Sequence, residues 1–182
     1  MHPADAAWRA SLDAEIAERG LSPLARDELL ARLGWEVSEL HPGLGRRLGP
    51  LHVVPLRGIT ERLGRFEGML GGHRLHNDGR STIVVDVTSL DVTGSHNDVR
   101  DTLLHELGHE IHSQTTSSVD WLIAELFTSG GATPFCPRAG RNHREWFAEN
   151  CMRHVAYGDL EALDRIGYAA VRTVLIALEL EE

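Results

Sequence analysis

The hydrophobic and polar positions of this chain predict several helices around a short sheet. Residues 4–34 are expected to form two helices with a break at residues 20–23, where Ser22 can cap the second helix. A stretch rich in glycine and proline, residues 41–50, follows. The N-terminal segment, residues 1–48, is therefore expected to be helical, and to be either part of the main domain or an accessory to it.

The remaining residues, 49–182, are expected to form the main domain. Its first half combines short strands with one helix: a strand near residues 51–56, a helix near 60–70, and a hairpin of strands 74–76 and 81–88 about the turn Asn77-Asp78-Gly79. Its second half is expected to be helical: a helix after Ser95, and helices near 119–128, 142–157 and 168–180, with a loop at 129–140. The expected fold class is α+β, with a small mixed or antiparallel sheet packed against helices.

The sequence HELGH, which begins at His105, carries the most specific chemistry in the chain. Residues four apart project from nearly one face of a helix, so His105 and His109 can bind one cation. Glu106 lies one step round the helix, where its carboxylate can reach a metal-bound water and act as a general base. Ser95 and Asp98 resemble a capping box that starts this helix. The pattern therefore predicts a catalytic zinc site.

A catalytic zinc needs a third protein ligand from elsewhere in the chain. Glu145 is the preferred candidate, because it opens the run Glu-Trp-Phe-Ala-Glu on the helix expected at residues 142–157. Glu149 lies on the same face one turn later, where it can accept the other ring N–H of a ligating histidine. Three further acidic residues are weaker candidates for the third ligand: Asp120, Glu110 and Glu125.

His112 returns to the same side of the helix as His105 and His109. We interpret it as a histidine that supports the site or lines the cleft. The alternative is a fourth protein ligand, which would close the coordination sphere and make the zinc structural. A longer motif with a third histidine six positions after the second is absent, because Thr115 stands there, and this argues against the metzincin class.

Taken together, the HExxH helix and the later EWFAE sequence resemble the gluzincin metallopeptidases. HELGHEIH with EWFAE is similar to the catalytic domain of anthrax lethal factor and its relatives, including the Pro-Pro endopeptidases. The resemblance covers about residues 50–182 and lies in these motifs. It implies a zincin-like fold with one zinc per chain, held by His105, His109 and Glu145, with Glu106 as the base and Glu149 as a supporting residue.

The resemblance also implies how a substrate binds. In these folds a hairpin precedes the active-site helix, and its last strand, here residues 81–88, forms the rim of the cleft. An extended substrate can add to that strand through main-chain hydrogen bonds. An ordinary edge strand without this role is the alternative.

One position departs from the family pattern. The lethal-factor relatives carry a tyrosine seven positions before the glutamate ligand, where its hydroxyl stabilises the oxyanion of the tetrahedral intermediate. Here that position is Arg138. Four residues are candidates for donating to the developing negative charge in its place: Arg138, Arg141, His143 and Tyr157.

Composition fits one domain and excludes several partners. The 182 residues, 42% of them hydrophobic, suffice for one buried core and not for two full domains. The net charge of −9 argues against nucleic-acid binding, since the only basic excess is the short run 138–144. No run approaches the length of a membrane span and no signal peptide is recognisable, so a cytoplasmic location is the default expectation. Cys136 and Cys151 give no disulfide framework, although a bridge between them is the alternative.

All 18 basic residues are arginine, which is typical of a GC-rich bacterial genome. We therefore expect a bacterial zinc metalloendopeptidase that hydrolyses peptide or protein substrates with a metal-activated water and a glutamate base. One alternative is a catalytically silent zinc-binding or interaction protein of the same fold. Another is a toxin or effector peptidase that avoids lysine-directed modification and reaches a target cell by a non-classical or toxin-delivery route. The oligomeric state is not predicted.

Overall fold

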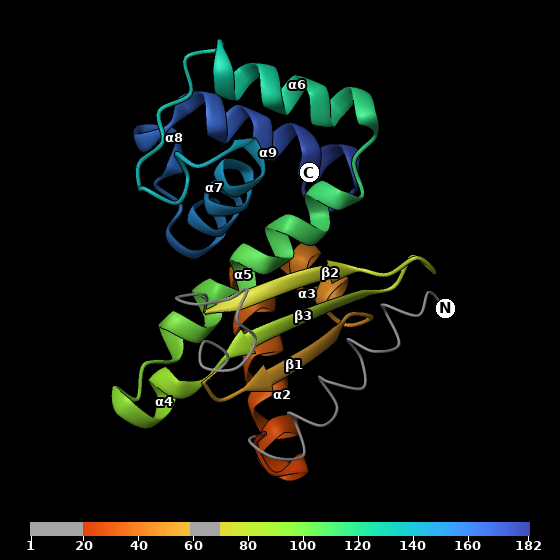
Figure 1. Ribbon diagram of the computed structural model, residues 1–182, viewed down its shortest axis with the longest axis vertical. Helices are drawn as coiled ribbons and strands as arrows, with labels where there is room; N and C mark the ends of the chain where they lie inside the picture. Colours follow the sequence, from red (N-terminus) through yellow and green to blue (C-terminus); the bar gives the residue numbers. More distant parts are fainter. Residues whose placement is uncertain (1–19, 59–69) are drawn as a thin grey trace.

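A long helix, α5 (His96–Ser113), runs between a small sheet and a group of C-terminal helices (Figure 1). This arrangement is seen in a computed structural model, which describes residues 20–58 and 70–182. Helices α2 (Pro23–Leu40) and α3 (Pro42–Leu48) lie behind the sheet in this view, and α2 packs against α5. The predicted α+β fold class is confirmed.

The sheet in the described residues has three strands in the order β1-β3-β2. Strand β1 (His52–Leu56) pairs parallel with β3 (Ser81–Asp86), whereas β2 (Gly71–Leu75) pairs antiparallel with β3. The strand expected at 51–56 and the hairpin that follows are confirmed, and the sheet is mixed.

The expectation that residues 81–88 form the rim of a cleft is wrong. Strand β3 is central, and every one of its residues is buried, because its apolar run Ile83–Val85 needs cover on both faces. Strand β2, which is only partly buried, lies at the edge of the sheet and packs on α5. The edge strand that packs on α5 is thus the first strand of the hairpin.

Helix α2 begins as predicted at Ser22, whose hydroxyl accepts a hydrogen bond from the Ala25 amide. It does not end at Gly34 as expected but continues to Leu40. Leu33 and Val37 are fully buried on either side of this glycine, and their packing outweighs its cost of about 1 kcal/mol in a helix. The helices expected at 4–19 and at 60–70 fall on residues outside the described parts of the chain, apart from Leu70.

The helices of the C-terminal half follow the predicted order. Ser95 caps α5 by accepting from the Asp98 amide, and Asn142 caps α7 (His143–Tyr157). The helix expected at 119–128 is α6 (Ser117–Thr128), and the one expected at 168–180 is α9 (Arg165–Ala177). Two short helices were not predicted: α4 (Thr88–Val92) and α8 (Leu160–Leu163).

Helix α5 is fixed by contacts on two sides. Towards α7 it presents Gly108, where a Cβ atom would lie 2.8 Å from the Cα of Ala148, so the two backbones touch. Towards α3 it presents Glu110, whose buried carboxylate accepts two hydrogen bonds from the Arg47 guanidinium, at 2.7 and 3.2 Å. The long α5 helix is therefore clamped between the N-terminal and the C-terminal helices.

A single hydrophobic core joins these parts. Leu33 of α2 and Leu44 of α3 belong to the same buried cluster as Leu103 of α5 and Trp146 of α7. The N-terminal helices that the structure describes thus share the core of the segment expected to form the main domain. Within the described residues, no helix is long and apolar enough to cross a membrane.

Candidate metal centre

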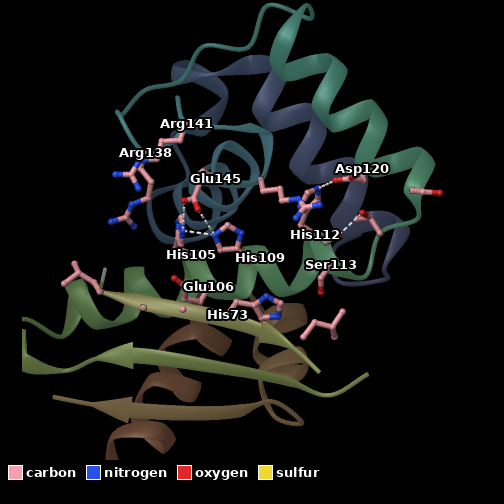
Figure 2. A pocket seen from close by; sticks show the side chains of 17 residues that line it. His73, His105, Glu106, His109, His112, Ser113, Asp120, Arg138, Arg141 and Glu145 are labelled. Atoms are coloured by element: carbon pink, nitrogen blue, oxygen red, sulfur yellow. Dashed lines mark hydrogen bonds and ion pairs between the residues drawn. The ribbon is translucent and has the colours of Figure 1, made fainter. Parts of the chain in front are cut away.

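The crossing of α5 and α7 brings together the three residues that were predicted to bind zinc. His105 and His109 lie one turn apart on α5, and Glu145 lies in the first turn of α7, so its carboxylate faces both imidazoles (Figure 2). The capping of α7 by Asn142, which accepts from the Glu145 amide at 3.0 Å, fixes where this turn begins. Local helix signals therefore set the position of each side chain.

The donor atoms of these residues converge. The Nε2 atoms of His105 and His109 lie 3.1 Å apart, and they lie 3.4 and 3.6 Å from the two carboxylate oxygens of Glu145. A tetrahedral zinc with bonds of about 2.0–2.1 Å holds its donors about 3.4 Å apart. Two imidazole nitrogens and one carboxylate are also a known donor set of catalytic zinc. The residues present fit a zinc ion in both chemistry and spacing.

Glu149 supports this group from behind. One of its oxygens lies 3.1 Å from Nδ1 of His105 and 3.3 Å from the Arg138 guanidinium. Burial alone would raise the pKa of Glu149, but His105 and Arg138 hold it below its usual value. An ionised carboxylate at Nδ1 orients the ring so that Nε2 faces the other donors, as expected for a supporting residue.

The two histidines respond in opposite ways to their surroundings. Burial alone would lower the pKa of His105, but the carboxylates of Glu145 and Glu149 outweigh it and raise that pKa to about 9. The pKa of His109 is lowered to about 4, first by burial and then by the positive charge of His105. The pair therefore carries one positive charge at neutral pH, and a metal ion would displace that proton.

Glu106 is buried beside the same donors, with its side chain against strand β2. A Cβ atom at Gly71 would come within 3.0 Å of the Glu106 carboxylate, so only glycine allows this approach. Burial is the main cause that raises the pKa of Glu106 to about 7. A divalent cation on the neighbouring histidines would lower that pKa and favour the ionised base.

The donors open into a cavity of about 730 Å³. One wall is the edge strand β2, including His73, and the floor is α5. The opposite wall carries Arg138 and Arg141, which precede α7. Arg144, in the first turn of α7, also lines the cavity. The cavity can thus hold a chain segment between a strand edge and a positively charged wall.

Of the four candidates for stabilising an oxyanion in place of a tyrosine, two line the cavity and two do not. Arg138 and Arg141 line the cavity, and the Arg138 guanidinium is paired with Glu149, which lies next to His105. Tyr157 does not: its hydroxyl donates to Asp101 on the flank of α5, and it lies outside the cavity wall. His143 faces Asp120, at 3.1 Å. Tyr157 was a candidate because the sequence does not show which way the C-terminal end of α7 faces.

The weaker candidates for the third ligand have other partners. Glu110 points to Arg47 on the opposite side of α5, and the Ser129 hydroxyl donates to Glu125 at the end of α6. Asp120 lies between His112 and His143. His112 belongs to that second group and not to the donors around Glu145, so the geometry does not support it as a fourth ligand.

Two residues of the site were not identified from the sequence. His73 lines the cavity from β2, and its pKa is lowered to about 4 by burial and by the nearby His76, so it is neutral at pH 7. Gly71 makes room for Glu106. The glycine pair Gly71-Gly72 is typical of a strand that another group approaches closely. That interpretation also requires β2 to lie at the edge of the sheet, which the sequence does not show.

No family model, curated protein or solved structure matches the chain. The resemblance to the gluzincins therefore rests on two short motifs, HELGH and EWFAE. An assignment of function must be supported by the geometry of the site itself.

Proposed function

We propose that this protein is a zinc-dependent endopeptidase of gluzincin type. The observation that carries the proposal is the convergence of His105, His109 and Glu145 at separations of 3.1, 3.4 and 3.6 Å, on the wall of an open cavity. A structural zinc would have a fourth protein ligand and no access from a cavity of this size. The buried Glu106 beside these donors supports a hydrolytic role.

A zinc ion bound here would polarise the scissile carbonyl and lower the pKa of a water molecule towards about 7. Glu106 would take the proton from that water and later pass it to the leaving amine. Its burial and its contact with Gly71 hold the carboxylate beside the donors. Glu149 would keep His105 oriented through Nδ1. The route needs no covalent intermediate on the protein.

The substrate would be a peptide or protein segment in extended form. Among the described residues, β2 pairs with β3 alone, so its other edge can accept a peptide backbone as a further strand. The cavity beside it matches that use. The arginines on the opposite wall favour acidic side chains or the carboxylate of a cleaved product near the metal.

Arg138 is the best placed group to stabilise an oxyanion. It lines the cavity, stands where the relatives carry tyrosine, and already touches the carboxylate next to His105. The same observation favours the alternative function, a zinc-binding protein without turnover. A guanidinium held by Glu149 is partly neutralised, and no tyrosine is among the described residues that line the cavity.

The test combines metal content with cleavage. Zinc-loaded protein is incubated with a proteome-derived peptide library, and new termini are identified by mass spectrometry. We expect cleavage by the native protein, none by Glu106→Gln with its zinc retained, and loss of one zinc ion per chain in Glu145→Ala. Arg141→Gln is the matched cavity control and should keep its zinc. Zinc binding without any cleavage would favour the silent protein, whereas equal cleavage by Glu106→Gln would refute the mechanism.

A further inference from the structure

A second group of ligand-type side chains lies a few residues from the first. His112 ends α5, Asp120 lies in the first turn of α6, and His143 begins α7. One oxygen of Asp120 lies 3.0 Å from Nε2 of His112 and 3.1 Å from Nε2 of His143. The donor atoms of all three lie within 4.8 Å of one another. The donor set repeats that of the first centre, with aspartate in place of glutamate.

The buried imidazole of His112 is the second observation that supports a binding site here, beside the hydrogen bond between His143 and Asp120. Its side chain is 5% exposed, and its ring stacks on Phe147 at 5.3 Å, which fixes the plane of the imidazole. Its Nε2 atom is buried and makes no hydrogen bond in the described structure, although Asp120 is only 3.0 Å away. This buried nitrogen is open to a further partner, and a cation shared with Asp120 would satisfy it.

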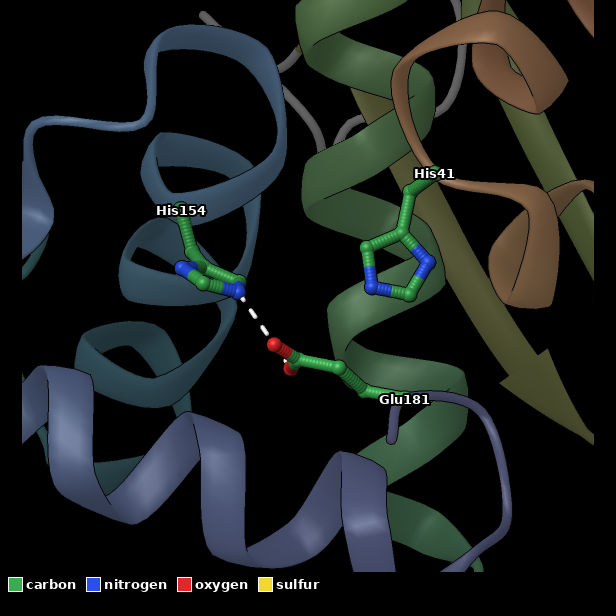
Figure 3. Close-up of side chains that lie close together, drawn as sticks. All are labelled: His41, His154 and Glu181. Carbon is green, nitrogen blue, oxygen red and sulfur yellow. Dashed lines mark ion pairs between the residues drawn. The ribbon is translucent and has the colours of Figure 1, made fainter.

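A third group, His41, His154 and Glu181, shows the contrast (Figure 3). Its carboxylate is already paired with the Arg172 guanidinium at 3.0 Å, and Nδ1 of His41 accepts from the Leu44 amide. The His154 imidazole lies 3.4 Å from the Glu181 carboxylate, so the spacing does not distinguish this group, whereas its existing partners do. Two of its three side chains already have an arginine or an amide partner, although Oε2 of Glu181 makes no hydrogen bond in the described structure, so the third group is the weaker candidate and serves as a comparison.

We propose that His112, Asp120 and His143 form a second binding site for a divalent transition-metal ion such as Zn²⁺. Two imidazole nitrogens select such ions over Mg²⁺ and Ca²⁺, which prefer oxygen. Arg144 is a positive charge nearby and opposes a cation, but the Asp120 carboxylate lies between the two histidines and compensates for it.

An ion at this site would join the ends of three helices. His143 lies two residues before Glu145, so the ion would also fix the first turn of α7, from which the first centre draws its carboxylate. It would hold α6 against the cavity, where both His112 and Asp120 form part of the wall. The second site thus has a positioning role towards the first and does not depend on peptidase activity.

The experiment counts Co²⁺ bound by metal-free protein in equilibrium dialysis, with visible absorption as a report of coordination by nitrogen. We expect about two ions per chain in the native protein and about one in each of His143→Gln, Asp120→Asn and Glu145→Ala. His143→Gln combined with Glu145→Ala should bind close to none. His154→Gln, a change in the third group, should bind as many ions as the native protein. Circular dichroism establishes that each variant is folded.

The variants distinguish the absence of the first site from the absence of the second. If the second site exists and the first does not, the native protein binds about one ion, which His143→Gln loses and Glu145→Ala keeps. If His143→Gln and Asp120→Asn both bind as much Co²⁺ as the native protein, the second site is refuted and the three side chains are a hydrogen-bonded group only.

Discussion

Gly71 of the edge strand β2 lies so close to Glu106 of α5 that a Cβ atom at position 71 would come within 3.0 Å of the Glu106 side chain. The same atom would lie 2.6 Å from the Thr102 methyl group. The strand that would bind the substrate and the proposed general base therefore touch. The strand and the Glu106 side chain can lie this close because residue 71 is a glycine and has no Cβ atom.

Gly71→Ala should reduce cleavage more than it reduces metal binding. The added methyl group must displace Thr102, Glu106 or the strand, and a shift of about 1 Å at the proposed base can cost about 100-fold in rate. The three atoms nearest to the added group belong to Thr102 and Glu106 and not to the proposed zinc donors, so zinc content should be unchanged. The check is kcat/KM with zinc content on the same sample. Gly34→Ala is the matched control, because a Cβ there meets nothing within 4 Å. Unchanged kcat/KM in Gly71→Ala would contradict the contact.

Gly108→Ala should weaken both folding and metal binding. Its Cβ would lie 2.8 Å from the Cα and 3.1 Å from the carbonyl oxygen of Ala148, and backbone atoms cannot swing aside. The helices must separate, which overpacking data put at about 1–3 kcal/mol of unfolding free energy. Separation also moves His105 and His109 away from Glu145. Urea unfolding measures the loss of stability, and competition with a chelator measures the zinc affinity. An unchanged zinc affinity would contradict the expected separation of α5 from α7.

Arg47→Met should destabilise the protein by about 3 kcal/mol, because among the described residues it leaves the buried Glu110 carboxylate with Gln114 as its only side-chain partner. Arg47→Met combined with Glu110→Gln should recover much of that loss, since no buried charge remains. Chemical unfolding of the two variants and of Glu110→Gln alone completes the cycle. Additive losses would mean that the pair contributes nothing beyond its separate side chains.

The two cysteines should differ in reactivity in the native protein. Both are free thiols, Cys136 is partly exposed, and Cys151 is fully buried between α5 and α7. Burial, with a smaller effect of Glu181, raises the pKa of the Cys151 thiol to about 12, so almost no thiolate forms at pH 8. Iodoacetamide at pH 8 should modify Cys136 alone, and both cysteines after denaturation. Mass spectrometry of the native sample decides, and equal labelling of both thiols would contradict the packing.

Much of the candidate metal centre could be predicted because its signals are local. The four-residue spacing of His105 and His109 fixes their common face on any helix, and Ser95 and Asn142 mark where the two helices begin. Glu145 could be preferred over Glu110 once two helices were expected, although only the crossing at Gly108 brings its carboxylate to the histidines.

The parts that were missed depend on the arrangement of distant segments. Which strand of the hairpin lies at the edge depends on β1, which joins β3 from outside the hairpin. The pairing of His112 with Asp120 and His143 requires three helix ends to meet. Tyr157 was placed near the site because it shares a helix with Glu145, but it lies twelve residues further along α7 and faces Asp101. No local pattern encodes these contacts.

The clamp between Arg47 and Glu110 also has a mechanical consequence. It acts on α5 through Glu110, which lies on a different face of the helix from His105 and His109, and so resists rotation of the helix about its own axis. A side chain tip about 6 Å from that axis moves about 1 Å when the helix turns by about 10°. Metal–ligand bonds tolerate only about 0.2 Å. Arg47 of α3 therefore helps to hold both histidines at their angle around the α5 axis. The spacing of the candidate donors depends in part on a helix that contributes none of them.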